Sequence, residues 1–384
     1  MSSLTLSNAV ALVGDELVDG ATIVVEGERI DSVKSVSTAG PYGIDCADLR
    51  ICPGSIDVHI HGAVGADVNA TDVDGLVEIA RFLARKGVTA WVPTLVPDSD
   101  ENYARVIGEI DRLMEIQTEE PIAQAVGVHY EGVFASEKMC GALRPQYFKT
   151  FSGTELASLP RLKNGVHMTT YAPEVDGGIE LTRELIREGW IASIGHTKAS
   201  TDVLDGAFEA GVRHLTHFFN AMTGLHHRDL GVVGWALTNP DVTFDIIADG
   251  VHVHPTMLAF ACRLKSPRKI TLISDSVSPT GLGDGEFEIW GEKISVINGR
   301  TENERGSIAG SVITMHEAAL QMKSLGFTPS EVTKMTSLNP AKLLGIESSR
   351  GSIAVGKRAD FVGIDREGNV RLTVIGGRVA FDAR

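Results

Sequence analysis

The 384-residue sequence predicts an α/β fold, a (β/α)8 barrel of the TIM type with a small β-sandwich formed by both ends of the chain. Two observations lead to this class. Runs of β-branched residues alternate with helical stretches through the middle of the chain, and short strand-like runs separated by turns occupy both ends. A third observation, histidines and carboxylates at the ends of the central strands, predicts chemistry at one face of the barrel.

The two ends of the chain share a strand–turn–strand pattern. In the first fifty residues the run ATIVVEGERIDSVKSV turns at EGER, as expected for a hairpin. The last thirty-five residues show the same order of strand, turn and strand. We therefore expect residues 1–52 and 348–384 to form one β-sandwich. Residues 53–347 then form the barrel domain.

Eight strand-like runs alternate with helical stretches in this middle part. An open, doubly wound sheet is the alternative, but no GxGxxG fingerprint follows an early strand and no Walker-type loop is present. The barrel is favoured. The runs are SIDVHIHG, VTAWVPTLV, AQAVGVHYEG, GVHMTTYAPE, WIASIGHT, VRHLTHFFNA, VTFDIIADG and KITLISDS.

Composition argues against several classes of partner. The 35 basic and 50 acidic residues give a formal net charge of −15, which disfavours nucleic acid and anionic membranes as partners. The sequence begins without a secretory pattern and has no run of about 18 apolar residues, so a soluble cytoplasmic protein is expected. The four cysteines show no CxxC pairing, which argues against a disulfide framework or a structural zinc site.

Six potential metal ligands fall at predicted strand ends. His59 and His61 lie two residues apart on the first strand, so an extended backbone directs both side chains to one face. For any one of these residues alone, a buried structural role is an equal alternative, but their convergence predicts a metal site. The other four end the third, fifth, sixth and eighth strands: Glu131, His196, His217 and Asp275.

Imidazole and carboxylate ligands together suit Zn²⁺ or Fe²⁺, and the lack of cysteine in the set favours a catalytic over a structural site. A metal ion of this kind lowers the pKa of water from about 16 to about 7, and a nearby carboxylate can carry the second proton. Because the eighth strand of a closed barrel neighbours the first, Asp275 is the candidate for this proton transfer.

These residues, in this order, resemble the amidohydrolase superfamily and, within it, the N-acetylglucosamine-6-phosphate deacetylases. The stretches that carry the resemblance are PGSIDVHIHG, HYEGVF, GHT, THFFNAM, ADGVHVHP, SDSVSPTG, GSIAGS and GSIAVGKRADFV. The resemblance implies hydrolysis of N-acetyl-D-glucosamine 6-phosphate to D-glucosamine 6-phosphate and acetate, in amino-sugar catabolism and cell-wall recycling.

The resemblance also implies that the protein binds one or two divalent ions, with Zn²⁺ favoured and Fe²⁺ as the alternative. It implies that Glu131, His196 and His217 form the main site and that His59, His61 and Asp275 form the second, with Glu131 as the bridge. Superfamily members that bridge their metals with a carboxylated lysine carry it after the fourth strand. No lysine stands there, which weakens a dihydroorotase or hydantoinase assignment.

For the substrate, the resemblance places the phosphate near Asn220 and Ala221 and near Arg228, which is similar to an arginine that crosses the interface of a homodimer. His252 matches a histidine that contacts the sugar and polarises the acetyl carbonyl. A solvated side chain is the alternative for Arg228. Further candidates for substrate contact are Ile308, Ala309, Cys140 and His227, with an incidental thiol and a solvated imidazole as alternatives for the last two.

One departure from the family pattern concerns Leu143, which occupies the place of a histidine that contacts sugar hydroxyls. It keeps open the galactosamine or mannosamine epimer as substrate. A non-catalytic sugar-phosphate sensor on the same fold is the alternative from another class. We expect His129, His167, His214 and His254 to be structural.

Overall fold

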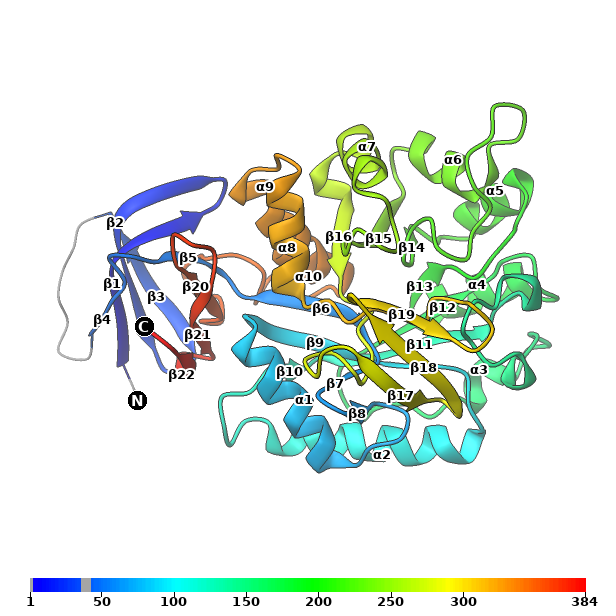
Figure 1. Cartoon of the computed structure of the whole chain (residues 1–384), viewed down its shortest axis with the longest axis horizontal. Coiled ribbons are helices and arrows are strands. Elements are labelled where there is room, and N and C mark those ends of the chain that lie inside the picture. The colour runs from blue at the N-terminus through cyan, green and yellow to red at the C-terminus, as the bar shows by residue number, and fades with distance from the viewer. Residues whose placement is uncertain (1–2, 36–42) are drawn as a thin grey trace.

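The computed structural model describes residues 3–35 and 43–384 (Figure 1). Residues 1–2 and 36–42, which belong to the predicted N-terminal part of the sandwich, lie outside the described residues. No helix formed by the described residues is long and apolar enough to cross a membrane.

The middle of the chain forms the predicted barrel, in which every pair of neighbouring strands is parallel. The short β10 (Gln124–Ala125) adds to β9 beside the main strands. A parallel bridge between Ile60 and Ser276 brings the last strand back to the first. The barrel strands are β6 (Ser55–Ile60), β9 (Val88–Leu95), β11 (Gly127–Phe134), β12 (Val166–Tyr171), β13 (Ile191–Ile194), β14 (His214–Leu215), β15 (Thr243–Ile247) and β16 (Ile270–Ile273).

A helix follows each barrel strand and covers the outside of the sheet (Figure 1). The first shows why these segments are helical, because its apolar residues recur every three or four positions and Asp72 caps its first turn by accepting from the Gly75 N–H. These helices are α1 (Val73–Arg85), α2 (Asp100–Ile116), α3 (Glu155–Ser158), α4 (Gly178–Arg187), α5 (Thr201–Glu209), α6 (Gly231–Thr238), α7 (Pro255–Lys265) and α8 (Met315–Ser324). Shorter helical segments are η1 (Glu137–Met139), η2 (Pro145–Tyr147), η3 (Pro267–Lys269), α9 (Pro329–Thr333), η4 (Lys334–Leu338) and α10 (Asn339–Leu343).

The two ends of the chain meet in a separate sheet at the left of Figure 1, as predicted. Its core contains Leu6, Ile23, Ile51, Phe361 and Val374. The sheet runs in the order β22, β21, β20, β5, β1, β2, β3, with β4 also pairing with β1. The strands are β1 (Ser3–Val13), β2 (Glu16–Glu26), β3 (Arg29–Lys34), β4 (Gly43–Asp45), β5 (Arg50–Pro53), β20 (Phe361–Ile364), β21 (Val370–Ile375) and β22 (Arg378–Asp382).

The sandwich is one continuous sheet whose two edges approach each other. The EGER turn joins β2 to β3 as expected, since Glu26 pairs with Arg29. Gly377, in the turn before β22, packs so closely on this hairpin that a Cβ there would lie 2.2 Å from the carbonyl oxygen of Gly27. The domain limits at residues 52 and 348 stay predictions.

A three-stranded antiparallel sheet after β16 was not anticipated from the sequence. It consists of β17 (Gly285–Ile289), β18 (Glu292–Ile297) and β19 (Arg300–Asn303), and a small hairpin of β7 (Gly62–Ala63) and β8 (Ala66–Asp67) follows β6. The turn between β17 and β18 brings Trp290 against His61, so this sheet covers the C-terminal end of the barrel.

Candidate metal centre and active site

All six predicted ligands meet at the C-terminal ends of the barrel strands. They form two groups of three, in each of which the ligand atoms lie within 4.8 Å of one another. Their exposed fractions run from 0% for His59 to 7% for Asp275. The groups are His59, His61 and Asp275, and Glu131, His196 and His217.

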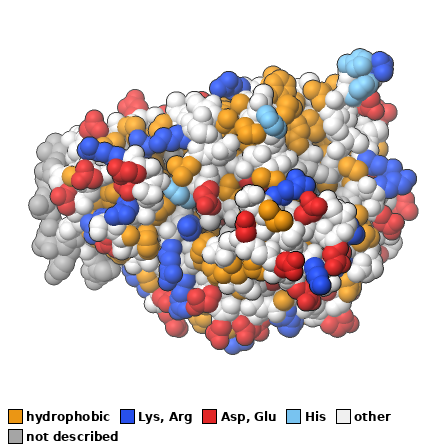
Figure 2. Space-filling model, viewed as in Figure 1, with side chains coloured by type: hydrophobic (Ala, Val, Ile, Leu, Met, Phe, Trp, Pro, Cys, Tyr) orange, Lys and Arg blue, Asp and Glu red, His pale blue; other side chains and the backbone are white. Residues whose placement is uncertain are grey.

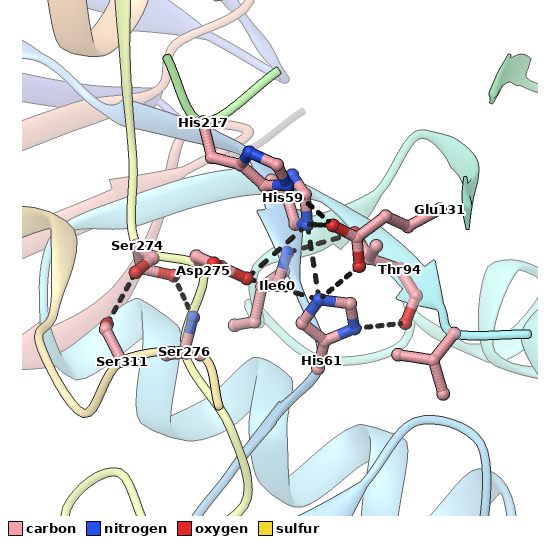
Figure 3. A network of polar contacts seen from close by, with 12 residues as sticks. His59, Ile60, His61, Thr94, Glu131, His217, Ser274, Asp275, Ser276 and Ser311 are labelled. Carbon is pink, nitrogen blue, oxygen red and sulfur yellow. Dashed lines mark hydrogen bonds and ion pairs between the residues drawn. The ribbon is translucent and has the colours of Figure 1, made fainter. Parts of the chain in front are cut away.

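Glu131 lies between the two groups. Its Oε1 is 3.0 Å from His217 Nε2 and 3.1 Å from His196 Nε2, whereas its Oε2 is 3.2 Å from His61 Nε2. Figure 3 shows Glu131 facing His59 and His61 from β11, with Asp275 on the opposite side. One carboxylate is therefore placed to bind ions of both groups, the bridging position that the resemblance implies.

In three of the ligand histidines the ring nitrogen Nδ1 already has a hydrogen-bond partner in the protein. Nδ1 of His61 lies 3.2 Å from the carbonyl oxygen of Thr94, and Nδ1 of His196 lies 2.9 Å from that of Met139. His59 Nδ1 meets the Thr216 hydroxyl at 3.1 Å. Because a carbonyl only accepts, the Nδ1 atoms of His61 and His196 carry hydrogen and their Nε2 atoms offer lone pairs to an ion.

The electrostatics of the group also suit a cation. Burial raises the pKa of Glu131, but the surrounding histidines outweigh it and hold that pKa well below its usual range. Burial lowers the pKa of His61, yet its contacts with Asp275 and Glu131 raise it to about 10, and Glu131 likewise raises the pKa of His217 to about 9. Without an ion, protons neutralise the carboxylates, and a divalent cation can replace them.

The backbone is unusual at three of the ligands. His196, His217 and Asp275 have φ values of 48°, 27° and 49°, in the left-handed region that side chains with a Cβ rarely occupy. Such strain persists where the surrounding structure imposes it, and it is found most often at functional sites.

A cavity of about 290 Å³ opens in front of the ligands. Of the predicted substrate contacts, Asn220, Ala221, His252 and Ile308 line it, as does Leu143. Its volume lies near the lower end of the range found for small-molecule sites. The cavity thus adjoins the metal ligands and has the size of a small polar ligand.

His252 is held by a carboxylate that the sequence did not single out. Its Nδ1 lies 2.6 Å from Asp249 Oδ2, and its backbone N–H donates to Asp249 Oδ1 at 2.8 Å. Burial raises the pKa of Asp249, but the hydrogen bond from His252 outweighs it and lowers that pKa overall. Asp249 therefore fixes the ring, with Nδ1–H as donor and Nε2 free for a ligand.

The other predicted substrate contacts do not line the cavity. Arg228 and His227 lie on the exposed loop before α6, with Arg228 Nη1 2.7 Å from His227 Nε2. Histidine and basic side chains project at the upper right of Figure 2, where α6 lies in Figure 1. Cys140 is partly exposed, and Ala309 is fully buried between Ile308 and Gly310 in the chain, both of which line the cavity. Their roles stay predictions.

The histidines expected to be structural have partners outside the ligand set. His129, packed against His59, meets the Thr170 hydroxyl at 2.8 Å, and burial lowers its pKa well below the usual value. His167 accepts from the Leu162 N–H, and His254 caps α7 by accepting from the Thr256 N–H.

Trp290 is a site residue that sequence reasoning missed. It lines the cavity, and its ring centroid lies 5.3 Å from that of His61. The signal was present in the alternating run around it and in the Asn298–Gly299 pair, which favours a two-residue hairpin turn. What the sequence did not indicate is the direction in which this sheet folds.

Comparisons with known proteins agree with this geometry. The amidohydrolase family pattern matches residues 50–380. The N-acetylglucosamine-6-phosphate deacetylase of Bacillus subtilis (strain 168) is 33% identical over 99% of this chain and 97% of that protein. The N-acetylgalactosamine-6-phosphate deacetylase of Escherichia coli O157:H7 is 34% identical over 86% of this chain and 87% of that protein.

Among solved structures, the N-acetylglucosamine-6-phosphate deacetylase of Pasteurella multocida matches with a TM-score of 0.91 at 26% identity, covering 98% of this chain and 99% of that chain. These matches confirm the resemblance on which the site residues were proposed. The chain belongs to the amidohydrolase family.

Proposed function

We propose that this protein hydrolyses the acetamide group of N-acetyl-D-glucosamine 6-phosphate, releasing acetate and D-glucosamine 6-phosphate. The observation that carries the proposal is the pair of ligand groups joined by Glu131 beside a cavity of about 290 Å³. The similarity to the Bacillus subtilis deacetylase, over nearly the whole of both chains, favours this substrate.

The residues present would hold one or two divalent ions, of which Zn²⁺ is favoured by the nitrogen and oxygen ligands. Such an ion supplies activated water and a positive charge beside the acetyl carbonyl oxygen. Asp275 accepts a proton from the attacking water and passes it to the nitrogen of the breaking C–N bond. His252, held by Asp249 at Nδ1, carries a second proton at Nε2 in this step and donates from Nε2 to the carbonyl oxygen as negative charge develops there.

The phosphate group requires a positive partner that the cavity itself does not supply. Among its described lining residues there is no lysine or arginine, and Asn220 and Ala221 offer only neutral groups. Arg228 is exposed on the loop before α6 and is free to reach a neighbouring molecule. We infer a homodimer in which Arg228 of one copy binds the phosphate in the site of the other.

The galactosamine epimer is the second candidate substrate. Leu143 lines the cavity with only 3% of its surface exposed, and its side chain offers no hydrogen bond to a sugar hydroxyl. The Escherichia coli relative is named for that epimer.

Acetate release from the 6-phosphates of N-acetylglucosamine, N-acetylgalactosamine and N-acetylmannosamine, compared at equal concentrations, tests the substrate. We expect the highest kcat/KM for the glucosamine compound, and a preference for galactosamine would replace our substrate. Loss of turnover on chelation, with recovery on adding Zn²⁺, is expected of the enzyme. A protein that binds the sugar phosphate with no turnover under any metal would instead be a sensor.

All four cysteines are unpaired, which supports a reducing compartment and hence a cytoplasmic location. Fractionation of the native cells tests this point, and recovery of the protein outside the cytoplasm would contradict it.

A further inference from the structure

We propose that Asp245 and His214 are positioning residues for His217 and that they set the affinity of the Glu131–His196–His217 group for its ion. The inference rests on the proposed function only in requiring that a metal ion binds. It does not depend on the identity of the substrate.

His217 differs from the other ligand histidines in how its ring is held. Those three rings each have a partner at Nδ1, as described above. The Nδ1 atom of His217 is buried without a hydrogen-bond partner in the part of the chain that the structure describes. Hydrogen bonding at the far side of the ring therefore does not orient this ligand, and its position depends on its backbone.

Asp245, on β15, holds that backbone. Its Oδ1 accepts a hydrogen bond from the His217 N–H, and its carbonyl oxygen accepts from the Phe218 N–H at 2.8 Å. The Asp245 side chain is fully buried, so water does not compete for these contacts. Two consecutive N–H groups at the metal ligand are thus fixed by one residue of the neighbouring strand.

His214 in turn holds Asp245. Its Nε2 lies 3.2 Å from Asp245 Oδ2, and its Nδ1 lies 2.8 Å from the hydroxyl of Thr243. Because a carboxylate only accepts, Nε2–H donates to Asp245, and the exposed fraction of the His214 side chain is 3%. The two oxygens of Asp245 are therefore divided between His214 on one side and the His217 backbone on the other.

The loop that needs this support is strained. His217, Phe219 and Ala221 have φ values of 27°, 80° and 50°. Left-handed backbone at such residues relaxes when the contacts that impose it are removed. Relaxation would carry His217 Nε2 away from Glu131 Oε1, from which it now lies 3.0 Å, while the ligands at the ends of β6 and β16 stay in place.

The test is metal affinity in the absence of substrate, measured by competition with a chromogenic chelator on purified, full-length protein. His196→Ala identifies the ion bound by the Glu131–His196–His217 group, because it removes one of that ion's ligands. We expect Asp245→Ala to weaken the binding of this ion about 10- to 100-fold, the range typical of residues that orient metal ligands. Asp245→Asn keeps an oxygen that can accept from the His217 N–H and is expected to recover most of the affinity. His214→Gln, which still donates to Asp245, is expected to lie between them.

His167→Gln serves as the matched control, since it changes a histidine with a hydrogen bond outside the site. The melting temperature of the metal-free proteins separates positioning from general destabilisation, and Co²⁺ absorption spectra report the geometry at the ion directly. A folded Asp245→Ala protein with wild-type affinity and an unchanged Co²⁺ spectrum would overturn the inference, as would a folded Asp245→Asn protein that binds the ion no better than Asp245→Ala. An Asp245→Ala protein that loses affinity equally for both ions would also overturn it.

The proposed function can fail separately from this inference. If wild-type protein binds metal but hydrolyses no N-acetyl amino-sugar phosphate, the proposed function is wrong and this inference is unaffected. If wild-type protein binds no metal, both are wrong.

Discussion

The backbone N–H of Asp275 donates to the carbonyl oxygen of His59 at 2.9 Å. This hydrogen bond joins the end of β16 to the end of β6, so the last barrel strand delivers its carboxylate beside the histidine pair of the first strand. In the same place Asp275 Oδ1 lies 3.2 Å from His61 Nε2. Closure of the barrel thus completes the second ligand group.

Replacing Asp275 by asparagine should separate proton transfer from folding. The backbone contact with His59 remains in Asp275→Asn, but an amide is a poor base, so we expect kcat to fall about 10²- to 10⁴-fold. Acetate release at saturating substrate, with metal content measured on the same sample, provides the check. Turnover near the wild-type level with a full complement of metal would show that another group carries the proton.

The bridging position of Glu131 predicts that a single change weakens both ions. Glu131→Gln removes the charge shared by His61, His196 and His217, so both equivalents should be lost or bound more weakly. His61→Ala is expected to weaken only the ion of its own group. Metal analysis by mass spectrometry after gel filtration distinguishes the two variants. Retention of one full equivalent by Glu131→Gln would mean that the groups are independent.

The raised pKa values of two ligands predict a pH dependence for the metal-free protein. His61 and His217 have folded pKa values of about 10 and 9, above the usual value near 6.5. Their ion pairs therefore contribute their full stability below about pH 6.5, and this contribution is lost as the pH rises through 9 to 10. Chelator-treated wild type should accordingly be more stable than chelator-treated His61→Ala at pH 7, and the difference should shrink by pH 10. Urea unfolding at both values measures it; a constant difference would contradict the prediction.

The same shifts mean that metal displaces protons at pH 7. Calorimetric titration with Zn²⁺ in buffers of different ionisation enthalpy should show net proton release, and apparent affinity should rise with pH. Proton uptake on binding would be incompatible with protonated imidazoles at the site.

The proposed role of Arg228 predicts complementation between inactive subunits. Arg228→Ala should raise KM, because a charge-assisted contact with the phosphate is lost. If the arginine acts across a dimer, each mixed dimer of Arg228→Ala and Asp275→Asn subunits contains one intact site. At substrate concentrations well below the raised KM, where Arg228→Ala alone is nearly inactive, equal mixtures that exchange subunits should then recover about a quarter of wild-type activity. No recovery in demonstrably mixed dimers would place Arg228 in its own site or outside any site.

Some of this site could be predicted because it is encoded locally. His59 and His61 share a face through the two-residue repeat of a strand, and Glu131, His196, His217 and Asp275 each end a recognisable β-branched run. Parallel strands of a barrel present these ends at one face, so the type of fold was enough to bring the ligands together.

Tertiary structure alone decided the contacts that hold those ligands. Two of these contacts are hydrogen bonds between segments about 30 residues apart: His61 Nδ1 with the carbonyl oxygen of Thr94, and the His217 N–H with Asp245. A third is the ring contact of His61 with Trp290, which belongs to a sheet inserted much later in the chain. Local periodicity determines which elements form and which face of each is buried. It carries no information on the direction in which an inserted sheet folds or on which distant group satisfies a buried nitrogen, because those depend on the packing of the whole chain.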